Sequence, residues 1–176
     1  NQKILDDRQM TGFCESVAVP DLRSGVLTVS QANGFAGLDS NTVLLGWPSQ
    51  LDALPKVLGV VRCLDELNKC TLIYKHQEDI STQVASRQIV VWWKGREHNG
   101  DLMLLLAHLL RGNKGWADSQ IILKSVAANH ELAAARQKEF SELLPEIRIN
   151  GRVEVVVKRD DESVVDVIQR HSRGAA

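Results

Sequence analysis

The sequence predicts an α/β fold, with a mostly parallel, doubly wound sheet flanked by helices. Segments rich in β-branched residues alternate along the chain with segments of helical length, which is typical of βαβ units. Most of the strand candidates are apolar nearly throughout, as expected of strands covered by helices on both faces. With 176 residues and 44% hydrophobic side chains, the chain is large enough to bury a core of this kind.

Six segments have the composition of short strands. The predicted strands are residues 13–19, 42–47, 70–74, 88–93, 120–126 and 152–158.

Five helical segments lie between and after these strands. Residues 21–33 follow Pro20 and end near Gly34, which are ordinary start and stop positions. Residues 51–68 carry Leu54, Val57, Leu58, Val61 and Leu64 on one apolar stripe. The predicted helix at 101–111 is apolar enough to be nearly buried, whereas the one at 131–144 is more exposed. Acidic residues stand before or within the first turn of the last helix, 161–171, where they favour the helix amino terminus.

The charge and the cysteines exclude several classes of function. The formal net charge is −1 with no basic run, which argues against nucleic acid as the main partner. The longest apolar stretch, 102–110, is interrupted by His108 and is about half of the ~20 residues that a membrane span needs. Cys14, Cys63 and Cys70 form no CxxC pair, so we expect buried thiols in the cytosol and no metal site. The chain begins without a methionine or a signal-peptide pattern, as we expect of an excised domain.

The loop in "VVWWKGREHNGDLMLLL", residues 90–106, is the first candidate for a binding site. Gly95 and Gly100 have the spacing of the P-loop glycines, but Asp101 and Leu102 stand where Lys and Ser or Thr are required. A carboxylate would repel a phosphate, whereas Asp is a favoured helix cap. We therefore predict a structural loop, with Asp101 as a cap.

No other segment forms a convincing catalytic, cofactor or metal site. His98 lies between Glu97 and Asp101, but no Ser or Cys nucleophile stands nearby, so we expect a surface residue. We expect His108 to be a hydrogen-bonded core residue. "GWPSQ", residues 46–50, supplies a turn and a potential helix cap at Ser49, yet it lacks the glycine-rich cradle that a nucleotide needs. We accordingly predict no enzyme activity, no cofactor and no small-molecule ligand.

The four tryptophans stand out because aromatic residues are scarce in this chain. Trp92 and Trp93 occupy adjacent strand positions and must face opposite sides of the sheet, so we expect one beneath each helical layer. A tryptophan exposed instead would be a good interface anchor.

Two segments resemble the cytoplasmic carboxyl-terminal domain of cation–chloride cotransporters, particularly the K–Cl type. The first runs from "TGFCESVAVPDL" through "NTVLLGWP", and the second is "IVVWWKGREHNGDLMLLLAHLLRGNKGWADSQIILKSVA". Gly12 to Cys14, Gly46 to Pro48, Trp92 to Trp93 and Trp116 fall in register with the family's motifs. Residues 99–101 read Asn-Gly-Asp where the family commonly has Asp-Gly-Gly, and the phosphoacceptor insertion of animal members is reduced to residues 76–87. The resemblance therefore implies a compact, prokaryotic homologue without that kinase control.

The resemblance implies a universal-stress-protein-like fold and a regulatory, dimer-forming role for a transporter at the cytoplasmic face of the cell membrane. We expect residues 1–37 to be the end of a first subdomain whose upstream part is missing, and residues 38–176 to be the second. The expected partners are the transporter's own membrane domain and a second copy of the chain, paired through the helix at 161–171 or the Trp-bearing strands. The alternative is a nucleotide-binding sensor of the universal-stress-protein type, with backbone amides converging near residues 34–37 or 49–50.

Overall fold

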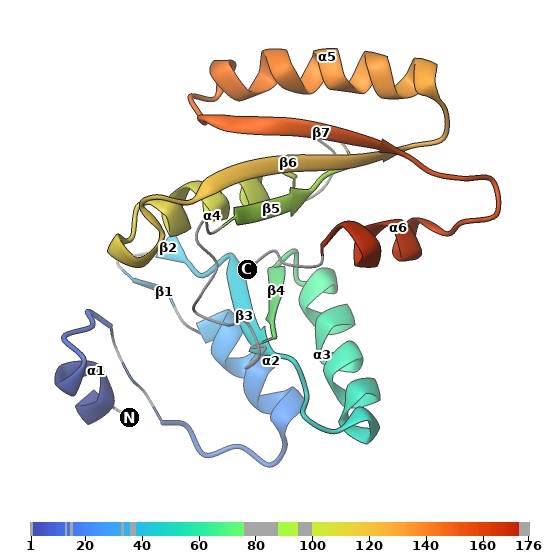
Figure 1. Ribbon diagram of the computed structural model, residues 1–176. Coiled ribbons are helices and arrows are strands. Elements are labelled where there is room, and N and C mark those ends of the chain that lie inside the picture. The colour runs from blue at the N-terminus through green and yellow to red at the C-terminus, as the bar shows by residue number, and fades with distance from the viewer. Residues whose placement is uncertain are drawn as a thin grey trace. The chain divides into compact units, whose positions relative to one another are not determined.

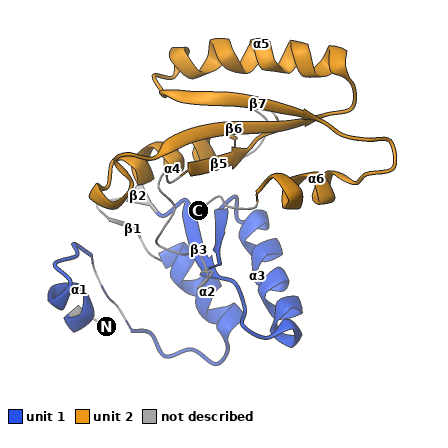
Figure 2. Ribbon diagram, in the orientation of Figure 1, with its two compact units in different colours: residues 1–76 blue, residues 77–176 orange. Residues whose placement is uncertain are grey.

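The computed structural model divides the chain into two units, residues 1–76 and 77–176 (Figure 2). It describes residues 2–12, 14, 16–32, 34–35, 38–75, 88–94 and 100–172. The loop predicted at 76–87 lies outside the described residues. Both units contain parallel strands flanked by helices, so the predicted α/β class is confirmed. The parallel strands fall into two sheets, one in each unit, where a single sheet was expected.

Unit 1 is built around two parallel strands, β3 (Thr42–Gly46) and β4 (Cys70–Tyr74), joined through helix α3 (Leu54–Glu66). Helix α2 (Leu22–Ala32) packs on α3, and Arg23 donates to the buried Cys63 Sγ at 3.0 Å. Asp21 accepts hydrogen bonds from the Ser24 hydroxyl and N–H, which lower the pKa of its carboxyl. The remaining elements are α1 (Gln2–Asp7), the two-residue antiparallel strands β1 (Gly34–Phe35) and β2 (Leu38–Asp39), and the 3-10 turn η1 (Leu51–Ala53).

Unit 2 has a three-stranded parallel sheet in the order β5-β6-β7 (Figure 1). Its register pairs Gln88 with Gln120 and Ile121 with Gly151 at the start of the ladders. Because neighbouring strands are consecutive in sequence and parallel, each connection must cross over the sheet, and α4 and α5 supply the two crossovers. The elements are β5 (Gln88–Trp92), α4 (Gly100–Arg111), η2 (Lys114–Trp116), β6 (Gln120–Ala127), α5 (His130–Glu146), β7 (Gly151–Val157) and α6 (Val164–His171).

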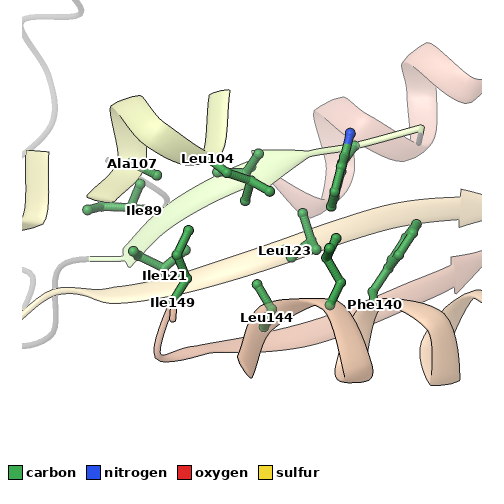
Figure 3. Close-up of a cluster of buried hydrophobic side chains, with 11 residues drawn as sticks. Ile89, Leu104, Ala107, Ile121, Leu123, Phe140, Leu144 and Ile149 are labelled. Atoms are coloured by element: carbon green, nitrogen blue, oxygen red, sulfur yellow. The ribbon is translucent and has the colours of Figure 1, made fainter. Parts of the chain in front are cut away.

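The core of unit 2 lies on one face of this sheet (Figure 3). Alternate residues of β5 and β6, including Ile89 and Leu123, meet Leu104 of α4 and Phe140 of α5 there. The two crossover connections have the same hand and advance across the sheet in the same direction. Both helices therefore lie on one face of the sheet, which explains why α4 and α5 share a single core. The opposite face carries α6, whose Val167 is fully buried.

The strand predicted at 13–19 is wrong for the described residues of that segment. Cys14 and residues 16–19 adopt no regular structure, and Val17 and Val19 are exposed. A strand is stable only where a neighbour accepts its backbone hydrogen bonds, and no described strand pairs with this segment. The division between the two units falls at 76/77; the subdomain boundary at 37/38 stays a prediction.

Candidate functional site

The loop after β5 is only partly within the described residues. Gly95 and His98 lie outside them, and Gly100 opens α4. Asp101 is not the cap that the sequence predicts, because it already lies within the first turn of the helix, where its negative charge still favours the amino terminus.

Trp92 and Trp93 face opposite sides of the sheet, as predicted. Trp93 is 3% exposed and stacks on Phe140 in the core, with ring centroids 5.4 Å apart. The Trp93 N–H of the main chain bonds to the Lys124 carbonyl, which continues the β5–β6 ladder by one residue. Trp92 is half-buried on the other face, where its Nε1 donates to Ser172 Oγ at 2.8 Å. The tryptophan pair therefore fixes both helical layers to one strand.

A row of three registered side chains crosses the α6 face of the sheet, formed by Trp92, Lys124 and Glu154. Parallel register places the three side by side on β5, β6 and β7. The ammonium of Lys124 lies 5.9 Å from the Trp92 ring centroid and 3.2 Å from the Glu154 carboxylate. It also donates to the His171 carbonyl at 3.0 Å. A cation at this position suits the carboxyl end of α6, where the helix dipole is negative.

Lys124 is 8% exposed. A buried ammonium is tolerated only when it is paired and hydrogen-bonded, and the carboxylate, the carbonyl and the indole ring meet that need. The carbonyl belongs to α6, and the indole in turn donates to Ser172 at the end of that helix, so this arrangement anchors α6 on the sheet.

Helix α6 is stabilised at its amino end by a capping box. Ser163 Oγ accepts from the Asp166 N–H, and the Asp166 carboxylate accepts from the Ser163 N–H and hydroxyl. These hydrogen bonds, the one from the side-chain hydroxyl first, lower the pKa of Asp166. Glu162, which precedes α6, pairs with Arg170 at 2.9 Å and so adds a second contact within this segment.

Helix α4 exposes a leucine face, defined here as Leu105, Leu106, Leu109 and Leu110. The prediction that this helix is nearly buried is therefore wrong: only Gly100, Leu104 and Ala107 are buried, whereas Leu105 is 51% and Leu109 is 55% exposed. His108, predicted in the core, is also exposed. The reason is geometric, since a helix lying on one face of a sheet turns its opposite side away from the core. A contiguous exposed apolar surface of this kind is typical of a protein–protein contact.

The other aromatic and thiol side chains have structural surroundings. Trp116 packs against the unit 2 core, and Trp47 is exposed with the Lys75 ammonium 5.9 Å from its ring centroid. Cys63 is buried, as predicted, whereas Cys14 and Cys70 are only half-buried. Among the described residues, no group of His, Cys, Asp or Glu is arranged to hold a metal ion.

The two segments considered for nucleotide binding have ordinary local roles where they are described. Gly34 and Phe35 pair with Asp39 and Leu38 in the β1–β2 hairpin. Ser49 is exposed and does not cap the following helix, contrary to the prediction, because Gln50 precedes η1 and makes no side-chain cap. Nucleotide binding stays a prediction that no described contact bears on.

A scan against known protein-family models finds none that matches this chain. Among the helices that the structure describes, none combines the length and the apolar character needed to cross a membrane.

Proposed function

We propose that the chain is a non-enzymatic, cytoplasmic regulatory and dimerisation domain of a membrane cation–chloride cotransporter. The observation that carries the proposal is the exposed leucine face of α4. This face belongs to the longer of the two segments that resemble the transporter family, and it fits a contact with another protein surface better than it fits chemistry.

The same segment contains residues with internal structural roles. Trp93 is a core residue and Trp92 holds α6, so the rare residues of the motif are accounted for by packing. Packing does not account for the leucines that follow in the sequence, because their exposed side chains contribute little to the stability of unit 2. Full burial of a leucine is worth about 1.5–3 kcal/mol. Covering four half-exposed leucines would therefore contribute a few kcal/mol to a complex, enough to couple this domain to a transporter.

The chain, joined to the membrane domain of a K–Cl-type cotransporter, tests the proposal through chloride-dependent uptake of rubidium as a potassium tracer. The double variant Leu105→Ser/Leu109→Ser removes the two most exposed leucines of α4 and should lower uptake several-fold at an unchanged amount of transporter in the membrane. Leu132→Ser is the matched control, because Leu132 is 38% exposed on a different helix of the same unit. Uptake that is indifferent both to the double variant and to removal of the whole chain would contradict a regulatory role.

A further inference from the structure

Strand β7 forms one edge of the unit 2 sheet, since the strand order is β5-β6-β7 (Figure 1). In a parallel ladder alternate residues direct their backbone groups to opposite sides of the strand. The Lys158 N–H donates to the Ala127 carbonyl on β6, so the backbone N–H and C=O groups of even-numbered residues are directed inward, toward β6. The carbonyl of Val153 faces outward, where the Gln137 amide of α5 donates to it at 3.1 Å. Val155 and Val157 have the same outward parity, and no contact to another described residue accounts for their outward N–H and C=O groups.

A groove of about 590 Å³ runs between α5 and the start of this edge strand. Gln137 and Ser141 line it from the helix, and Asn150 and Arg152 line it from the strand side. Arg148, between the two elements, adds a second guanidinium. The groove is therefore basic and lies next to backbone groups that can pair with an extended segment, which is the arrangement used in recognition by strand addition.

We propose that this edge pairs with β7 of a second copy of the chain, antiparallel, about a two-fold axis that passes through Val156. The inference deepens the proposed dimerisation role by assigning its surface. A two-fold axis is the commonest symmetry of homodimers and makes the contact self-complementary. Residues whose backbone N–H and C=O groups point outward must lie opposite each other in the two strands. Val155 therefore faces Val157 of the second copy, and the two residues exchange both backbone hydrogen bonds.

The charged side chains at even-numbered positions of β7, which lie on the same face of the sheet as Glu154, favour this register. With the axis at Val156, Glu154 lies opposite Lys158 of the second copy, whose N–H still continues the β6–β7 ladder. This pair of opposite charges occurs twice, and Arg152 meets no like charge, because β7 ends at Val157 and Asp160 lies in the turn that follows. An axis at Glu154 would set that carboxylate against itself, and one at Val155 would set Arg152 against Lys158. Opposite charges stabilise cross-strand pairs, whereas like charges directly opposite destabilise them.

The neighbouring elements are compatible with this pairing. Lys158 of the second copy would extend the row formed by Trp92, Lys124 and Glu154, giving alternating charge across the joined sheets. On α5, the positions one turn before Gln137 on the edge side are Ala133 and Ala134. Their small side chains leave room for the equivalent helix of the second copy, because interaxial distance depends on side-chain size.

The experiment is sedimentation velocity over a range of concentrations on the full chain and on charge-reversal variants. The wild type should dimerise, and Lys158→Glu should raise the dimer dissociation constant at least about tenfold, since it sets a carboxylate opposite Glu154 of the second copy twice. Arg159→Glu is the matched control: it makes the same change of charge one residue further on, where the side chain does not share the face of Glu154, and it should leave the dimer unchanged. Circular dichroism checks that both variants fold.

A second variant tests the edge without relying on charge. Val155→Pro removes an outward N–H and leaves the β6 ladder intact, because proline is tolerated where the strand N–H faces solvent; it should also weaken the dimer. A wild-type dimer indifferent to both Lys158→Glu and Val155→Pro would overturn the β7 assignment and leave the dimerisation role standing. Weakening by V155P without weakening by K158E would overturn the register. A wild type that stays monomeric would overturn both the pairing and the dimerisation role, whereas the test on α4 leucines addresses regulation separately.

Discussion

The contact between Phe140 and Trp93 predicts a large loss of stability in the Phe140→Ala variant. Phe140 is 2% exposed, and its ring stacks on Trp93 at an interplanar angle of 19°. Removal of a buried phenylalanine side chain costs about 3–5 kcal/mol, of which the aromatic pair itself accounts for about 0.5–1.5 kcal/mol. For a unit of about 100 residues a loss of this size lowers Tm by at least about 12 °C.

Urea unfolding followed by tryptophan fluorescence measures this loss, because Trp93 reports on its own packing partner. Leu132→Ala is the matched control on the same helix: its side chain is partly exposed, so we expect a cost below about 1 kcal/mol. Phe140→Leu should fall between the two variants, since it keeps most of the apolar volume. A cost for Phe140→Ala no larger than that of Leu132→Ala would refute the assignment of the core to the α5 face of the sheet.

Two further predictions concern the attachment of α6. Glu154→Gln should destabilise unit 2 by about 1–3 kcal/mol, because it leaves the buried Lys124 ammonium without a counter-charge. Lys124→Met should be close to neutral, since it removes the buried charge itself. Equal losses of stability in thermal unfolding of the two variants would contradict this asymmetry. The lowered pKa of Asp166 makes its contribution to α6 fully present above its ordinary value of 3.8, and that contribution is lost as the pH falls through the still lower folded-state value. The protection of α6 amides, taken relative to their intrinsic exchange rate at each pH, should therefore fall in acid, and Asp166→Asn should remove that pH dependence.

The elements that the sequence predicts best are those whose local pattern and tertiary partner agree. Strand 70–74 has the predicted bounds, and α4 begins within one residue of its prediction. Segment 13–19 has a similar composition, but its described residues pair with no strand. Composition measures how well a residue fits a sheet, whereas strand formation depends on a neighbour that local sequence does not reveal. The error for α4 has the same origin, because hydrophobicity alone does not tell which side of a helix a sheet will cover.

Lys124 is the site residue that sequence reasoning missed. Its position is visible as a lone lysine in the apolar run "IILKSVA", and a charge inside a buried strand requires a partner. Glu154 lies thirty positions along the chain, and only the β6–β7 register places it beside Lys124. The carbonyl of His171 is still less predictable, since it depends on where α6 ends. The opposite orientation of Trp92 and Trp93 was predictable, because strand geometry alone dictates it.

The two proposed contacts use different elements of unit 2, and this has a consequence for assembly. Helix α4 packs on β5, whereas the pairing edge is β7, so one contact does not occupy the other's surface. In the proposed dimer, three strands from each copy would form one sheet, with the two β5 strands at its outer edges. Five strand spacings of about 4.8 Å separate those edges by about 24 Å. The two leucine faces would thus lie apart on one assembly, each available to a separate membrane domain. Strand pairing would fix the spacing at which two transporters are held, and the leucine faces would transmit regulation to each of them.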